Sequence, residues 1–154
     1  MSEIQRIVDQ LQRAFEGNAW HGPSVKEALN GVTADKAAAR PVAGAHSIWE
    51  LVHHIAAWEA LVRRRIEGEV IVDVPVEEDW PRVGDTNETA FIASLDELER
   101  GHNLLRETIS RMNESRLEET VPGKDYSLYV MLHGVVQHDL YHAGQIALLK
   151  RADR

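Results

Sequence analysis

The stretch Val135–Arg151, "VVQHDLYHAGQIALLKR", carries two histidines, His138 and His142, four residues apart. It ends a longer segment, from Ser127 to Arg151, whose apolar residues recur every three or four positions and predict a helix with Ser127 as its N-cap. The apolar stripe of this helix comprises Leu128, Met131, Leu132, Val135, Ile146 and Leu149. His142 falls in the middle of the stripe and His138 toward one side, whereas His133 falls on the opposite face. The sequence therefore places two imidazoles on the core side of a helix.

Two imidazoles on an inward face need up to four hydrogen-bond partners, because a buried unpaired polar group is costly. A spacing of four residues brings both rings over one face at about 5–6 Å, which suits two ligands of one metal ion. The second nitrogen of each ring can then donate to a nearby acceptor. A helix without metal is the alternative, with water and Asp139, which falls on the inner stripe, as partners of the rings.

Three other long segments have helical periodicity, namely Ser2–Glu16, Ser47–Glu67 and Asn87–Met112. The segment "PSVKEALNG" predicts one additional short helix, and the stretch "EVIVDV" is expected to be an extended loop. Four long helices predict an all-α four-helix bundle in a single domain, residues 1–154. The connector between the second and third helices has about 19 residues. It can extend over roughly 60 Å, enough to cross the bundle and leave these two helices parallel.

A third metal ligand is expected from the second helix. Its apolar stripe comprises Ile48, Leu51, Val52, Ile55, Trp58, Val62 and Ile66. His54 lies on the flank of this stripe, and His53 lies nearly opposite it. His54 is about 10 Å from the start of its helix, and His138 and His142 are about 12–18 Å from the end of theirs, so antiparallel packing brings all three to one level. Three histidines leave an open coordination position, as in catalytic sites, and suit Zn, Ni, Fe or Co.

The composition narrows the classes of function. The chain has 154 residues, 44% of them hydrophobic, and a net charge of −8, so we expect no nucleic-acid partner. No apolar run is long enough to span a membrane, and the first residues do not resemble a secretory signal. The chain contains no cysteine, which excludes disulfides and thiolate ligands and indicates a cytoplasmic protein. The basic run Arg63–Arg65 is expected at a solvated helix end.

The segment "HDLYH" also has the outline of the zincin motif H-E-x-x-H, with Asp139 in place of the general-base Glu. Asp is one methylene shorter, and no further ligand follows on a suitable helix, so this alternative is not favoured. Three more residues are candidates for the surroundings of the site. Trp58 could wall a pocket or belong to the core, Tyr141 could offer its hydroxyl to a substrate, and His46 could reach the open end.

Two segments resemble the DinB-like (YfiT-like) family of bacterial four-helix-bundle proteins. They are "SIWELVHHIAAWE" and, about 80 residues later, "HDLYHAGQIALLKR". The family motif is one histidine near the start of the second helix and an H-x-x-x-H pair on the fourth, followed by Gly-Gln. The matching positions are His54, His138, His142, Gly144 and Gln145. The "DWP" at 79–81 and the long crossover also fit.

The resemblance implies an up-down-down-up bundle, often a homodimer, with three histidines and water around a divalent transition metal, zinc or nickel foremost. It also implies transfer or isomerisation reactions that use small thiols such as mycothiol or bacillithiol, or metal-dependent hydrolysis. Our first hypothesis is an enzyme that activates a thiol cosubstrate, like a thiol S-transferase, or water, like a hydrolase, and acts on a small molecule. A thiol supplied by a cosubstrate would also suit a cysteine-free active site. The alternative is a non-enzymatic, metal-dependent stress or structural protein.

Overall fold

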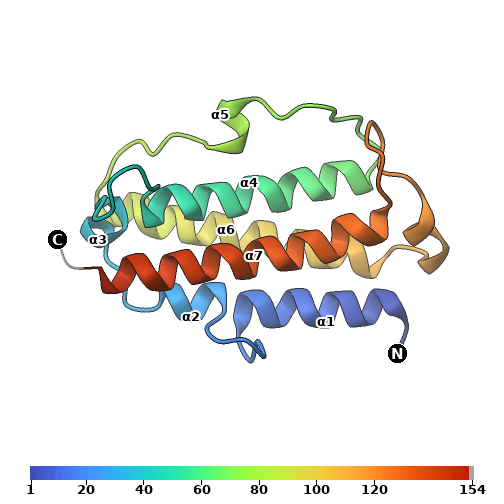
Figure 1. The fold of residues 1–154 in the computed structure, drawn as a ribbon, viewed down its shortest axis with the longest axis horizontal. Coiled ribbons are helices and arrows are strands. Elements are labelled where there is room, and N and C mark those ends of the chain that lie inside the picture. Colours follow the sequence, from blue (N-terminus) through green and yellow to red (C-terminus); the bar gives the residue numbers. More distant parts are fainter. Residues whose placement is uncertain (153–154) are drawn as a thin grey trace.

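The computed structural model describes residues 1–152, and within them every regular element is a helix. The four long helices are α1 (Glu3–Glu16), α4 (Ile48–Ile66), α6 (Glu88–Ser110) and α7 (Leu128–Arg151). The short elements are α2 (Val25–Leu29), α3 (Ala34–Ala38), α5 (Val76–Asp79) and the 3-10 turn η1 (Glu114–Glu118). The prediction of an all-α helical bundle is confirmed (Figure 1).

Each long helix begins after a polar residue whose side chain accepts a hydrogen bond from the backbone N–H of the first turn. These residues are Ser2, Ser47, Asn87 and Ser127. Such caps satisfy N–H groups that have no partner within the helix. The helix starts expected from the sequence agree with the structure for this reason.

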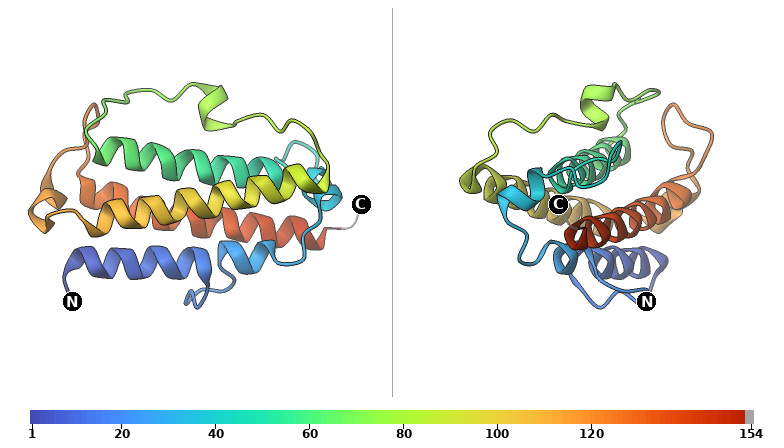
Figure 2. Two further views of the ribbon diagram at one scale, coloured as in Figure 1. Left: turned by 180° about the vertical axis from the view of Figure 1, so that it is seen from behind. Right: turned by 60° about the vertical axis from the view of Figure 1, so that its left-hand side comes forward.

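The four long helices lie side by side, and in Figure 1 the sequence colours advance in one direction along α4 and α6 and in the opposite direction along α1 and α7. Helix α4 packs against α6 and α7, and α1 packs against the same two helices. The connection from α4 to α6 passes back along α4 and carries α5, as both views in Figure 2 show. This arrangement places the start of α4 beside the C-terminal half of α7.

The core consists of two apolar clusters separated by a polar layer. The first cluster includes Ile55, Leu98 and Ala143, and the second includes Val62, Leu105 and Val136. Between them, three of the four long helices each contribute one fully buried polar residue: Glu59 from α4, His102 from α6 and Asp139 from α7. The polar layer therefore crosses the bundle at one level.

Two expectations about single residues and segments are wrong. The run Arg63–Arg65 is not a solvated helix end throughout, because Arg65 is only 2% exposed. The periodicity of the third helix also places Ile92 among its apolar residues, whereas this side chain is half exposed. Helices α3 and α5 were not expected, since each spans little more than one turn and carries no apolar periodicity. Among residues 1–152, no helix has both the length and the hydrophobicity to cross a membrane.

Candidate metal centre

Three histidine rings meet between α4 and α7. The Nε2 atom of His138 lies 3.1 Å from Nε2 of His54 and 3.1 Å from Nε2 of His142. His54 and His142 are buried, and His138 is partly buried. The structure therefore brings together all three residues expected to bind a metal, and they form a group that could hold an ion.

The outer nitrogens of two rings are already bonded to acceptors. His54 Nδ1 donates to the backbone oxygen of Asp79 at 2.6 Å, and His142 Nδ1 donates to Oε1 of Gln145 at 2.6 Å. A neutral imidazole carries one N–H, so the Nε2 atom of each of these rings has a lone pair and no proton. Both lone pairs face His138, whose single Nε2–H could satisfy only one of them. A cation at the centre satisfies all three nitrogens, so these residues fit a divalent metal ion.

Burial keeps the three rings in the form that binds metal. Loss of solvent lowers the pKa of His54, and its bonds to Asp79 oppose this only in part. Burial likewise lowers the pKa of His138 and of His142. A lowered pKa means that the neutral imidazole, which is the metal-binding form, is present at neutral pH.

The segment around α5 holds the His54 ring in place. Trp80 stacks on His54 at a centroid distance of 3.8 Å, and its other face stacks on His46 at 3.5 Å. The indole Nε1 of Trp58 donates to Oδ1 of Asp79 at 2.7 Å. The Asp-Trp-Pro stretch, noted in the sequence only as a motif, thus supplies both a ring that fixes His54 and the acceptor for its outer nitrogen.

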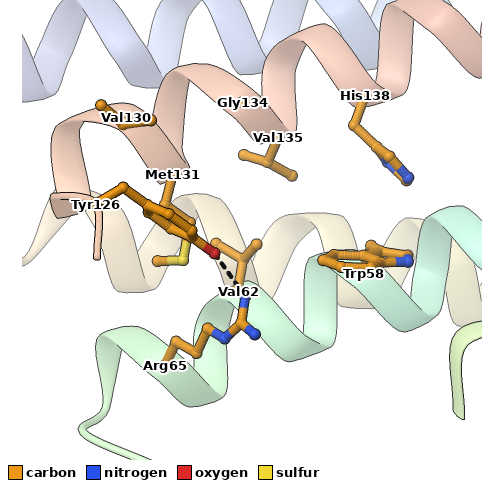
Figure 3. A pocket seen from close by; sticks show the side chains of 9 residues that line it. All are labelled: Trp58, Val62, Arg65, Tyr126, Val130, Met131, Gly134, Val135 and His138. Atoms are coloured by element: carbon orange, nitrogen blue, oxygen red, sulfur yellow. Dashed lines mark hydrogen bonds between the residues drawn. The ribbon is translucent and has the colours of Figure 1, made fainter. Parts of the chain in front are cut away.

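Two cavities flank the three histidines. The first, of about 230 Å³, has His138 and Trp58 at one end, as Figure 3 shows. The second, of about 400 Å³, is lined by His46, Trp80 and His142 among others. Trp58 therefore lines one cavity, and His46 lines the other together with His142. Tyr141 is 66% exposed, and it lines the second cavity beside His142.

The polar layer lies next to the histidines. His102 Nδ1 is 2.8 Å from Oε1 of Glu59, and Asp139 Oδ1 is 3.9 Å from Nδ1 of His138. Burial raises the pKa of Glu59 to about 8, and burial with repulsion from Glu59 raises the pKa of Asp139 to about 8. Together with His102, these carboxyl groups form a second group that could hold a cation. In its absence, the carboxyl pair retains a proton at neutral pH.

Asp139 therefore does not have the place of a zincin general base. Its side chain is fully buried in the polar layer, away from both cavities. It lies behind His138, as expected of a residue that supports a ligand, although the 3.9 Å separation is longer than a hydrogen bond.

The sequence interpretation missed Glu59, His102 and Arg65. A signal existed for the first two, because Glu59 continues the stripe between Ile55 and Val62, and His102 lies four residues after Leu98. Both are therefore polar residues at core positions, which is the same signal that identified His142. Arg65 has a similar position, three residues after Val62, but the neighbouring arginines concealed it.

Comparison with known proteins gives the family and the fold of the chain. A family model described as the DinB superfamily matches residues 19–146, which include all three histidines. The structure is similar to the crystal structure of a conserved protein from Enterococcus faecalis, with a TM-score of 0.70 and 17% sequence identity, over 99% of this chain and 97% of that one. No curated protein sequence matches the chain significantly.

Proposed function

Because the chain belongs to the DinB superfamily, we propose that it is an enzyme whose divalent metal ion, zinc or nickel, is held by His54, His138 and His142. The observation that carries the proposal is the convergence of three Nε2 atoms, two of which have no proton. A structural ion more often has four protein ligands, whereas the group around these atoms contains three within residues 1–152. Cavities on two sides favour chemistry over a structural role.

The reaction is the activation of a small thiol, as in thiol S-transferases, or of water, as in hydrolases. A bound divalent ion would supply Lewis acidity that lowers the pKa of the thiol or water. Asp79 and Gln145 fix the orientation of two ligand rings, and Trp80 holds His54 by stacking. His46 lines the second cavity, and we propose that it takes up the released proton there.

The proposal extends to the assembly. We propose the up-down-down-up topology that the family resemblance implies, and the helix directions in Figure 1 support it. We propose a homodimer on the same ground, and sedimentation of the purified protein tests it. A monomer across the accessible concentration range would remove the dimer from the proposal and leave the metal site untouched.

The enzymatic activity is tested with metal-loaded protein and two substrates. Bacillithiol or mycothiol with chlorodinitrobenzene measures thiol transfer, and nitrophenyl acetate measures hydrolysis. We expect one of the two rates to exceed the rate of the His138→Ala variant, while the His133→Ala variant on the same helix keeps the full rate. If the loaded protein binds its metal but accelerates neither reaction with these or related substrates, the non-enzymatic alternative is supported instead.

A further inference from the structure

Arg65 is a buried cation without a counter-ion. Its side chain is 2% exposed, and its neighbours Arg63 and Arg64 pair with Glu67 and Glu69. No carboxylate of residues 1–152 forms an ion pair with Arg65. Its Nη1 donates to the hydroxyl of Tyr126 at 3.2 Å and its Nη2 to the backbone oxygen of Ile71 at 2.9 Å, while Nε has no partner.

Arg65 lines the cavity that ends at the candidate metal centre. Figure 3 shows Arg65 and Tyr126 at one end of this cavity and Trp58 and His138 at the other. Trp58 and Arg65 are seven residues apart on α4, a rise of about 10 Å. Between the two ends, the walls are the apolar residues Val62, Val130, Met131 and Val135, with Gly134.

A buried guanidinium that lacks an anion is costly, because its charge has lost the solvation of water. The acceptors it has are neutral, and they use only two of the five N–H donors of an arginine. The Tyr126 hydroxyl accepts from Arg65, so its own proton remains free to donate. One planar cation beside one hydroxyl donor suits a single carboxylate, which arginine binds through two parallel hydrogen bonds.

We infer that this cavity binds a small amphipathic carboxylate, with its carboxylate at Arg65 and Tyr126, its apolar body along the valines, and its opposite end at His138. The ligand is the substrate or cosubstrate of the reaction proposed above, and this part of the inference rests on that proposed function. Binding of the carboxylate at Arg65 and Tyr126 does not require the metal.

Octanoate and its uncharged analogue octanamide test the carboxylate end by calorimetry on metal-free protein, in which the anion cannot bind a metal instead. We expect octanoate to bind on the order of tenfold more tightly than octanamide, the size of effect of a charge-assisted hydrogen bond. The Arg65→Met variant should lose this preference, and Tyr126→Phe should reduce it. Arg63→Met is the matched control and should retain it, because Arg63 is a partly exposed arginine two residues away that pairs with Glu67 and does not line the cavity.

Equal binding of the two ligands by the native protein, no binding of octanoate, or a preference that survives in Arg65→Met would each overturn the inference. Binding of octanamide by Arg65→Met shows that the variant keeps its cavity, so a lost preference then reports the missing cation. Tyr126→Phe leaves the cation in place and gives a second test.

The metal end is tested separately with cobalt-substituted protein and octanoate that carries a terminal thiol. We expect a thiolate-to-cobalt absorption band that is absent in His138→Ala and weaker in Arg65→Met. If the protein prefers octanoate but this band is absent, the anion site at Arg65 stands. The inferred contact between the other end of the ligand and the metal is then wrong. Failure of the native protein to bind cobalt would count against the proposed function alone, since the calorimetry needs no metal.

Discussion

The Nε2 atoms of His54 and His138 lie 3.1 Å apart, although 84 positions separate the two residues in the chain. Helices α4 and α7 pack against each other and bring the two rings to one level. The third ring, His142, approaches His138 equally closely from one turn further along α7. The same level carries the polar layer of Glu59, His102 and Asp139, so the bundle interrupts its apolar core where the candidate centre lies.

Gln145 is expected to tune the affinity for metal by orienting His142. Replacing it by alanine removes the acceptor of His142 Nδ1–H. Loss of such a partner of a metal-ligating histidine typically lowers metal affinity about 10–100-fold. We expect Gln145→Ala to weaken zinc binding by this amount in a competition titration with a chelator.

Gln137→Ala is the matched control, because Gln137 lies on the same helix and is exposed. It should bind zinc as the native protein does. Equal affinities of the two variants would mean that the bond between Gln145 and His142 does not support the site.

Leu132 is expected to contribute strongly to stability. It is fully buried in the second apolar cluster. Leu132→Ala should lower the free energy of unfolding by about 2–5 kcal/mol, because it removes buried apolar surface and leaves a cavity. Urea denaturation measures this value. Leu148→Ala on the same helix, at a side chain that is 67% exposed, should change it by less than about 0.5 kcal/mol.

Glu59 makes the stability of the metal-free protein depend on pH. Its pKa rises from 4.5 to about 8 because it is buried. Between these values the folded protein keeps a proton that the unfolded chain has released, so stability falls as the pH rises toward 8. From pH 6.5 to 8 the loss should be about 2 kcal/mol at most, since one proton gives about 1.4 kcal/mol per pH unit.

The Glu59→Gln variant has no carboxyl group at this position and should lose less stability over the same interval. Histidines with lowered pKa values act mainly below pH 6.5, and their smaller effect above it has the opposite sign and is shared by both proteins. Urea denaturation of chelator-treated protein at pH 6.5 and pH 8 compares the two proteins. An identical decrease in both would contradict the assignment of the retained proton to Glu59.

The long helices and the three histidines were predictable because they follow from periodicity and capping. His138 and His142 are polar residues on an apolar stripe, and His54 lies on the flank of another. Ser2 and Ser47 accept the cap hydrogen bonds that their positions suggest. Local sequence determines these features, so the pattern within each single helix is sufficient to predict them.

The surroundings of the site were less predictable because they depend on tertiary contacts. Trp80 reaches His54 only because the crossover passes back along α4, and no periodicity encodes that path. Arg65 looked solvated because it follows two other arginines, whereas the helix turns its side chain inward beside Tyr126. The shape of a cavity arises from several helices together and has no signal in any single segment.

The most direct test of the account is the metal content of purified, untagged protein, measured by mass spectrometry beside His138→Ala and the control His133→Ala. His133 is on the same helix, and its ring lies near Glu3 and Tyr129 instead of the three site histidines. We predict about one equivalent of zinc or nickel in the native protein and the control, as three histidine ligands on one ion require, and its loss in His138→Ala. A native protein that holds no metal even after reconstitution, or a His138→Ala variant that retains it, would contradict the central claim.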